Sequence, residues 1–411
     1  MMQDAAPTPH DTDVCIVGGG PAGMMLGLLL ARAGIGVTVL EKHADFLRDF
    51  RGDTVHPSTI NALDRIGLGG RLLALNHRKV SHLDVNFSDG RFRVADFSRL
   101  ANVHPYIVFL PQWDFLDMLA AEAAKYPRFS LLRSTEAVDL LREGTSVVGV
   151  VGEGRNGNGA VEVRAKLTVA ADGRHSTLRQ ALGWVPRELG APMDVLWFRL
   201  PRHDADVDGL DMHVNRGGIL LLIDRGDYWQ VALVIRKGGY DAVVAAGLDA
   251  FRKTVTSHAP MLAGRTDAIR SWDDVHVLSV SLNRLQQWHA PGVLLIGDAA
   301  HAMSPIGGVG INLAVQDAIA TANIITGPLK AGSLGTAHLA AVARRRRWPT
   351  TVIQTVQRIA QRQFVEKVLD GSGGVRAPAA LRLLQKIPQL QYFPARLVGV
   401  GVRPELPAVD Q

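Results

Sequence analysis

The stretch from residue 13 to residue 42 most tightly restricts the fold that this chain can adopt. An apolar run, DVCIVG, leads into the turn GGGPAG at residues 18–23, then into a long apolar stretch and a second apolar run, VTVLE. Residues 14–31 carry no charge and have the length of a membrane span, but three glycines and a proline in the middle disfavour one continuous helix. The spacing instead predicts a strand over 13–17, a helix over 21–33 and a strand over 36–42, which together form a parallel β-α-β unit.

The glycine turn has the pattern of a dinucleotide-binding loop. Its glycines permit a tight turn and let a pyrophosphate approach the first helical turn, whose free N–H groups attract anions. Glu41 ends the next strand, where a carboxylate accepts hydrogen bonds from a ribose and disfavours a 2′-phosphate. The sequence therefore predicts bound FAD or NAD. The residues predicted to hold it here are Gly18, Gly20, Pro21, Ala22, Gly23, Glu41 and Lys42.

The character of the chain changes along its length, and this predicts three parts. Residues 80–97 alternate around an Asp-Gly turn, as an antiparallel hairpin does. Strand-like runs separated by turns fill 181–275, and GVLLIGDAA at 292 returns to the buried parallel-strand style. We therefore expect an α/β fold in which a doubly wound, Rossmann-like domain receives a mostly antiparallel β-sheet substrate domain as an insertion. The expected boundaries are 1–73, 100–180 and 276–330 for the first domain, 74–99 and 181–275 for the second, and 331–411 for a C-terminal helical segment.

Finer expectations follow from local pattern. Residues 1–12 resemble a loose tail, and residues 113–124 a helix. Residues 146–171 are expected to hold three short strands. The C-terminal segment is expected to be helical to about residue 390 and then to end in FPARLVGVGVRPELP.

Composition narrows the functional classes. The 411 residues are 47% hydrophobic and 20% charged, with a net charge of +6 spread along the chain, so no nucleic-acid-binding module or metal-ligand cluster is expected. The dense basic run at residues 344–347 is expected to be a solvated helix face, with an anionic membrane surface as the alternative partner. Cys15 is the single cysteine, which excludes an intrachain disulfide and fits a reducing cytosol. We expect a cytoplasmic monomer or homodimer.

A second glycine-rich stretch, GDAAHAMSPIGGVGIN at residues 297–312, places chemistry at the end of another strand. Asp298 follows the apolar run VLLI, at the sheet edge where ligands of doubly wound folds bind. Glycines at 307, 308 and 310 would let main chain lie against a flat ring. Asn312 is expected to begin a helix whose N-terminal dipole stabilises the negative charge of a reduced flavin.

Together these motifs resemble the FAD-dependent aromatic hydroxylases, the class A flavoprotein monooxygenases typified by p-hydroxybenzoate hydroxylase. Residues 297–318 resemble the second flavin motif of that family. AADGRHSTLR at 170–179 resembles its middle motif, with Asp172, Gly173, Ser176 and Arg179 at the defining positions. The resemblance covers residues 11–330 and implies an FAD-binding Rossmann-like domain. It also implies a small aromatic substrate, O2, and NADH or NADPH as a transient electron donor.

The resemblance also implies individual roles. Arg51 would lie near the pyrophosphate and ribityl chain, Gln112 would contact the ribityl hydroxyls, and Asp298 would accept a ribityl hydrogen bond. Ala137 would offer backbone to the adenine, and Asp172 is either a helix cap or a direct cofactor contact. The remaining cofactor contacts implied are Gly308, Gly310, Ile311 and Asn312.

Catalytic groups are less well defined. The resemblance implies a C4a-hydroperoxyflavin whose distal oxygen is transferred to an electron-rich ring such as a phenol, a polyketide or a quinone precursor. A general base would assist a phenol, and Asp53 is the candidate, with a surface aspartate as the plainer interpretation. Pro305 matches a proline whose carbonyl faces the reaction zone. His213 and Trp229 are candidate pocket residues, although period-two alternation alone leaves their direction open.

His301 is expected to be a packed or capping residue rather than a base.

Two other functional classes remain as alternatives. One is an FAD-dependent dehydrogenase or reductase of a lipophilic substrate. The other is a flavoprotein of a membrane-peripheral assembly, suggested by the apolar stretch LRLLQKIPQLQYFPARLVGVGV, which is expected to pack on the body as a lid or docking helix. The related halogenases carry a Trp-x-Trp signature, and no two tryptophans here have that spacing.

Overall fold

The computed structural model describes residues 8–47, 54–155, 159–371 and 376–408. Its largest sheet contains the predicted parallel strands, in the order β20-β11-β1-β2-β8. Strand β1 is longer than predicted because Thr8 to Thr12 continue its pairing with β11, so residues 8–12 are not a loose tail. The bounds are β1 Thr8–Val17, β2 Val37–Glu41, β8 Phe129–Arg133, β11 Ala160–Ala170 and β20 Val293–Leu295.

Side chains of β1 alternate between two cores. Val14 and Ile16 pack against helices α1 (Pro21–Arg32), α4 (Gln112–Ala123) and α8 (Gly310–Lys330). Cys15 and Val17 face the other way, toward β9 (Thr135–Glu143), β10 (Ser146–Gly154) and α5 (Thr177–Ala181). A sheet covered on both faces needs apolar residues at every position, which explains the uninterrupted apolar runs. The prediction of three strands over 146–171 is wrong, since β10 and β11 account for the described part of that stretch.

The second sheet is the predicted antiparallel one. Within the described residues it has seven strands in the order β17-β13-β16-β15-β14-β5-β6, of which only the β14–β5 pair is parallel. The predicted hairpin is confirmed as β5 and β6, which join strands more than a hundred residues away. Strand β17 belongs to this sheet too, just beyond the expected boundary at residue 275. The bounds are β5 His82–Phe87, β6 Gly90–Asp96, β13 Met193–Pro201, β14 Leu210–Asn215, β15 Gly218–Asp224, β16 Tyr228–Arg236 and β17 His276–Leu278.

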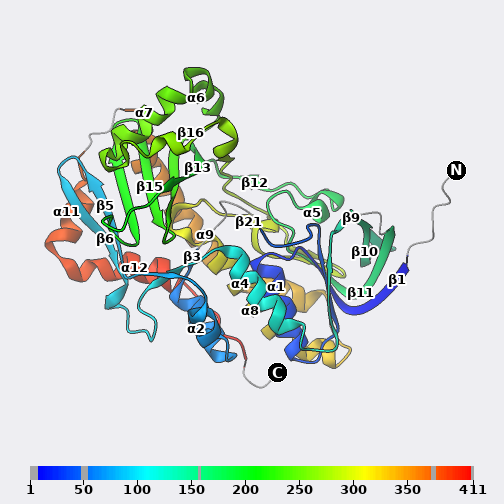
Figure 1. Ribbon diagram of the computed structural model, residues 1–411. Helices are drawn as coiled ribbons and strands as arrows, with labels where there is room; N and C mark the ends of the chain where they lie inside the picture. The colour runs from blue at the N-terminus through cyan, green and yellow to red at the C-terminus, as the bar shows by residue number, and fades with distance from the viewer. Residues whose placement is uncertain (1–7, 48–53, 156–158, 372–375, 409–411) are drawn as a thin grey trace.

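Cross-strand registers define the two faces of this sheet. Leu196, Leu233, Leu220 and His213 form one row across β13, β16, β15 and β14. The three leucines belong to the core shared with α7 (Leu248–His258), and α6 (Tyr240–Ala246) closes the same side. The adjacent row, Trp197, Ala232, Leu221 and Met212, faces the opposite core, to which Ile306 and the C-terminal helices contribute. In Figure 1 helices α6 and α7 lie above this sheet, whereas α1, α4 and α8 belong to the other part of the molecule.

Helix continues further along the C-terminal segment than expected. Helix α9 (Thr336–Ala360) passes through a π-helical turn into α10 (Glu366–Leu369), and α11 (Ala379–Lys386) precedes α12 (Tyr392–Gly399). The predicted end of helix near residue 390 is therefore wrong, because α12 contains the whole FPARLVG stretch. The segment packs on the body as expected, with α11 and α12 against β6 and Arg382 Nη2 at 2.7 Å from Asp89 Oδ2 (Figure 1).

One helical stretch, Ile306–Lys330, is long and apolar enough to cross a membrane, but 72% of its apolar window is buried inside the protein. It contains α8, which packs against α1 in the main core.

Candidate flavin-binding site

The glycine turn before α1 is an open cradle that only glycine can form. Gly18 has φ +104°, and a Cβ there would lie 2.4 Å from the carbonyl oxygen of Ala171. A Cβ on Gly23 would lie 1.9 Å from the carbonyl oxygen of Gly18, so the helix presses directly on the turn. Gly20, the N-cap, has open space where its Cβ would be, and no side chain caps the helix. The first-turn N–H groups of α1, beginning with Ala22 because Pro21 has no N–H, therefore border a space suited to a pyrophosphate.

Glu41 stabilises this cradle before it holds any ligand. Its Oε2 accepts the N–H of Gly19 at 2.9 Å and its Oε1 accepts the N–H of His43 at 3.0 Å. The side chain is buried. Lys42 is directed elsewhere, because its Nζ lies 3.9 Å from Glu136. Glu41 thus fits its predicted place beside the nucleotide, whereas the side chain of Lys42 is paired on the surface.

The middle motif braces the turn that carries Asp298. The buried Arg179 donates from Nη1 to the carbonyl of Ala299 at 3.0 Å and from Nη2 to the carbonyl of Arg174. Arg174 in turn lies 3.4 Å from Oδ2 of the partly exposed Asp298. Ser176 caps α5 by accepting the N–H of Arg179 at 3.0 Å. The motif therefore joins the ends of β11 and β20 at one edge of the sheet.

Asp172 acts as a helix cap with one of its two carboxylate oxygens. Its Oδ2 accepts the N–H of Leu178 at 3.2 Å, as a helix cap does. Its Oδ1 is buried and has no hydrogen-bond partner among the described residues. Burial raises the pKa of this carboxyl above its ordinary value. A buried acceptor without a partner is costly, and a hydroxyl of a bound cofactor would satisfy it.

The second glycine stretch forms a tight loop that leads into α8. The carbonyl of Pro305 accepts the N–H of Gly308 at 3.0 Å, so one lone pair of the predicted catalytic carbonyl is already used. Gly308 has φ +62°, and a Cβ there would lie 2.6 Å from Thr54 Oγ1. The Thr54 hydroxyl donates to the Gly308 carbonyl at 2.9 Å. Around Gly310 the space is open. The main chain is therefore open to a flat ring at Gly310, whereas Thr54 closes one side of Gly308.

Helix α8 begins at Gly310, not at Asn312 as predicted. Asn312 lies in its first turn with a buried side chain, whose Oδ1 accepts the hydroxyls of Ser58 at 2.7 Å and Thr59 at 2.6 Å. Ile311 is also buried. Both residues can offer only backbone to a ligand at the helix N-terminus, while their side chains anchor the helix to α2 (Pro57–Arg65).

The other predicted cofactor residues are placed as follows. Gln112 is the first residue of α4 and is partly exposed. The side chain of Ala137, on β9, is buried in the core beneath that strand. Arg51 and the candidate base Asp53 lie outside the described residues.

The structure does not place the two predicted pocket side chains on the face toward the glycine loop. His213 shares the row of Leu220, and its Nε2 lies 2.8 Å from Asp211 Oδ2. Trp229 is fully buried in the core beneath α7, and its Nε1 donates to Asp206 Oδ2 at 2.9 Å. Both residues lie on the side of the sheet that α6 and α7 cover, away from Ile306, so their place in a substrate pocket stays a prediction that this geometry disfavours.

Sequence reasoning missed the residues on the opposite face. They are apolar, only partly buried, and share one core with Ile306, the residue after Pro305. The alternation of β13 to β16 identified the two faces, but nothing in it showed which face meets the glycine loop. The strand residues concerned are Trp197, Met212, Leu221 and Val234, and Phe364 from the turn after α9 packs with them.

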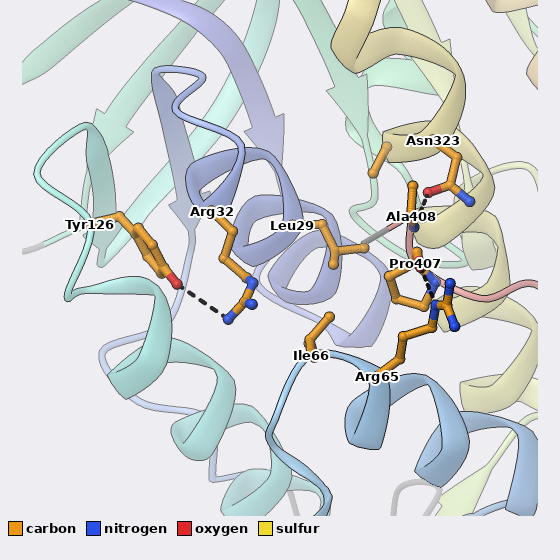
Figure 2. A pocket seen from close by; sticks show the side chains of 9 residues that line it. Leu29, Arg32, Arg65, Ile66, Tyr126, Asn323, Pro407 and Ala408 are labelled. Carbon is orange, nitrogen blue, oxygen red and sulfur yellow. Dashed lines mark hydrogen bonds between the residues drawn. The ribbon is translucent and has the colours of Figure 1, made fainter. Parts of the chain in front are cut away.

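A separate pocket of about 150 Å³ lies at the far end of α1, away from the glycine cradle. Figure 2 shows it between α1, α2, α8 and residues 407–408. Arg65 Nε donates to the carbonyl of Pro407 at 2.9 Å, and the N–H of Ala408 donates to Asn323 Oδ1 at 3.0 Å. These bonds secure the C-terminal segment on the outside of the main core.

The fold, the glycine cradle and the exposed loop before α8 define an FAD-binding protein, and the residues present fit that cofactor. Residues 11–356 match the model of the FAD-binding domain family, and the chain belongs to that family. Within it, the chain is an FAD-dependent monooxygenase of the aromatic hydroxylase group.

Two relatives support this assignment, and a solved structure shows the same fold. The chain is 34% identical over 380 residues to 6-methylpretetramide 4-monooxygenase of Streptomyces rimosus, covering 90% of this chain and 88% of the relative. It is 28% identical to protoasukamycin 4-monooxygenase of Streptomyces nodosus subsp. asukaensis, over 78% of this chain and 81% of that relative. The solved p-nitrophenol 4-monooxygenase of Pseudomonas putida DLL-E4 has a TM-score of 0.74 and 21% identity, covering 96% of this chain and 100% of that one. The last likeness is one of fold.

Proposed function

We propose that this enzyme hydroxylates an extended, electron-rich aromatic substrate of the polyketide type, with NADH or NADPH as electron donor. One observation carries the proposal: the row formed by Trp197, Leu221 and Met212 presents partly buried apolar side chains beside Ile306, next to the loop that meets the flavin ring. A broad apolar face fits a fused ring system better than a small charged phenol. The similarity to 6-methylpretetramide 4-monooxygenase supports the same class.

Bound FAD supplies the redox chemistry, taking a hydride from NAD(P)H and activating O2. The chain's own part is to bind, orient and exclude water. The glycine cradle and Glu41 would hold the nucleotide end, and Asp172 and Asp298 would accept hydrogen bonds from hydroxyls of the cofactor. The N-terminal turn of α8 directs its dipole into the site and favours negative charge there.

Substrate orientation would come mainly from shape. The apolar row would contact one face of the rings, and the remaining lone pair of the Pro305 carbonyl could accept a hydroxyl of the substrate. Asp53 remains the proposed base for a phenolic proton. No step requires His213 or Trp229.

A substrate panel tests the proposal. NADH and NADPH oxidation, oxygen uptake and hydrogen peroxide release would be measured with monocyclic phenols, naphthols and three- or four-ring polyphenols. We expect tight coupling, with little peroxide, for the polycyclic compounds only. Coupled turnover restricted to monocyclic phenols would contradict the substrate class. Turnover that continues without oxygen would contradict hydroxylation itself.

We further propose a cytoplasmic enzyme, monomeric or homodimeric, that touches membranes only weakly. The described part of the C-terminal segment packs on the body but leaves Leu383, Ile387 and Phe393 exposed, and residues 376–403 contain basic but no acidic side chains. A minor fraction of the protein should float with anionic vesicles. Changing these three residues together to serine should abolish that flotation. If all of the protein floated, the contact with the membrane would not be weak. If none of the protein floated, there would be no such contact. Light scattering would give the oligomeric state.

A further inference from the structure

Arg346 stands in the basic run expected to be a solvated helix face, yet it is fully buried. That expectation is wrong for this residue, because all three nitrogens of its guanidinium donate hydrogen bonds inside the protein. Nε donates to Asp317 Oδ1 at 2.9 Å and Nη2 donates to Gln316 Oε1 at 3.1 Å. Nη1 donates to the carbonyl of Arg403 at 3.1 Å and to Glu405 Oε1 at 3.3 Å. One side chain of α9 thus joins α8 to the C-terminal segment.

The first branch leads to the turn that carries Asp298. Asp317 Oδ2 accepts the N–H of Gly297 at 3.1 Å, and His301 Nε2 lies 2.6 Å from the same oxygen. Burial alone would raise the pKa of Asp317, but His301 and Arg346 hold it below its ordinary value. The ionised carboxylate therefore anchors the backbone immediately before Asp298, while the His301 ring packs on Trp288. His301 is a packed residue, as expected.

The second branch leads to the N-terminus of α8. Gln316 Nε2 donates to Ser58 Oγ at 3.3 Å, and Ser58 donates to Asn312 Oδ1 at 2.7 Å. Asn312 lies in the helical turn that borders the flavin ring. Arg346 is therefore connected to both parts of the GDAAHAMSPIGGVGIN stretch that meet the cofactor.

The third branch leads to the C-terminal segment. Glu405 is buried and also accepts two hydrogen bonds from Arg345, at 2.7 and 2.9 Å. The next residues are fixed by Arg65 and Asn323, as the bonds in Figure 2 show. Residues 403–408 thus complete the surroundings of a buried cation near the flavin site.

We propose that Arg346 is a positioning residue of the flavin site, and that through it the segment 403–408 and FAD stabilise each other. The guanidinium can serve three branches at once because it is a planar fork with five N–H donors, which a lysine ammonium cannot reproduce. Removing it would leave the Asp317 carboxylate buried with less compensation, and the Gly297–Asp298 turn would lose its fixed anchor.

The first test compares Arg346→Met with Arg345→Met. The two variants lose the same charge and both lose a Glu405 contact, but Arg345 has no bond to Asp317 or Gln316. Each apoprotein would be titrated with FAD while flavin fluorescence is followed, and its thermal unfolding would be recorded without FAD. We expect the Kd for FAD to rise at least tenfold for Arg346→Met and Arg346→Lys, but less than threefold for Arg345→Met. The proposal would be overturned if Arg346→Met and Arg345→Met had the same Kd for FAD and the same loss of apoprotein stability.

The second test measures the reverse effect and uses a milder variant in case Arg346→Met does not fold. Coupling between two sites is reciprocal, so FAD should slow hydrogen exchange in a peptide covering residues 397–408. Glu405→Gln should weaken FAD binding three- to tenfold and reduce that protection. The visible absorption of bound FAD should shift in the Arg346 variants only. FAD-independent exchange in the wild-type peptide, or unchanged FAD affinity in Glu405→Gln, would refute the coupling.

Discussion

The carboxylate of Glu41 accepts the N–H of Gly19 at 2.9 Å, so the acid at the end of β2 holds the glycine turn at the end of β1. Two features recognised separately in the sequence are therefore one unit. The acid pre-organises the backbone that meets the pyrophosphate, in addition to lying where a ribose would bind.

Replacing Glu41 by alanine should weaken FAD binding. The variant leaves the N–H groups of Gly19 and His43 without their acceptor, and each unsatisfied donor costs about 1–3 kcal/mol. We expect the Kd for FAD to rise by at least tenfold in a fluorescence titration. Glu136→Ala, which removes a surface partner of Lys42, is the control and should change the Kd less than twofold. Similar effects of the two variants would show that Glu41 does not organise the turn.

The glycine turn should not accept a side chain. At Gly18 the backbone has a positive φ of +104°, and the Cβ of an alanine would lie 2.4 Å from a carbonyl oxygen. We therefore expect Gly18→Ala to lower the free energy of unfolding by roughly 3 kcal/mol or more and to abolish FAD retention. Gly34→Ala has a similar φ of +79° but open space around the Cβ, and should cost only about 1–2 kcal/mol. Urea unfolding and the flavin content of the purified proteins would separate steric conflict from backbone strain. A Gly18 variant that keeps its FAD would be incompatible with this geometry.

Two adjacent residues of β14 test the assignment of the sheet faces. Met212 lies in the row toward Ile306, whereas His213 lies in the row toward α7. Met212→Ala should raise the KM for the substrate about five- to thirtyfold, since roughly 1–2 kcal/mol of apolar contact is lost. His213→Ala should leave the KM within twofold. Steady-state kinetics with any coupled substrate would decide the matter, and the reverse ranking would show that the other face lines the pocket.

His56 should make the protein less stable in acid. Burial lowers the pKa of this fully buried histidine to about 4, against the opposing effect of the Val398 and Gly308 carbonyls. Its Nδ1 lies 2.7 Å from the carbonyl of Val398, so the ring donates from Nδ1 and the buried Nε2 would have to take the second proton. Because the unfolded chain binds that proton near pH 6.5, stability is complete above pH 6.5 and falls as the pH drops toward 4, by up to about 3 kcal/mol.

The His56 effect can be isolated by difference. Urea unfolding of the wild-type protein and of His56→Gln would be followed from pH 7.5 to pH 4. We expect the free energy of unfolding to converge between the two as the pH falls, because the variant lacks the proton uptake. Parallel curves would mean that His56 does not titrate on unfolding.

The β-α-β unit, the cofactor and the family could all be predicted from the amino-acid sequence. These depend on local backbone requirements: positive φ at Gly18, close approach at Gly23, and a carboxylate one strand away at Glu41. Such requirements leave the same residues at the same short spacing wherever they occur, so they can be recognised without the fold.

Where residues far apart in the chain meet became clear from the folded molecule alone. Arg346 looks like its neighbours in a basic run, and its burial depends on Asp317 and Glu405, which come from distant parts of the chain. The direction of His213 and Trp229 was undetermined for a related reason: alternation divides a strand into two faces, but only packing against α7 and Ile306 shows which face is which. Local pattern records what the backbone needs, and burial is a property of the assembled molecule.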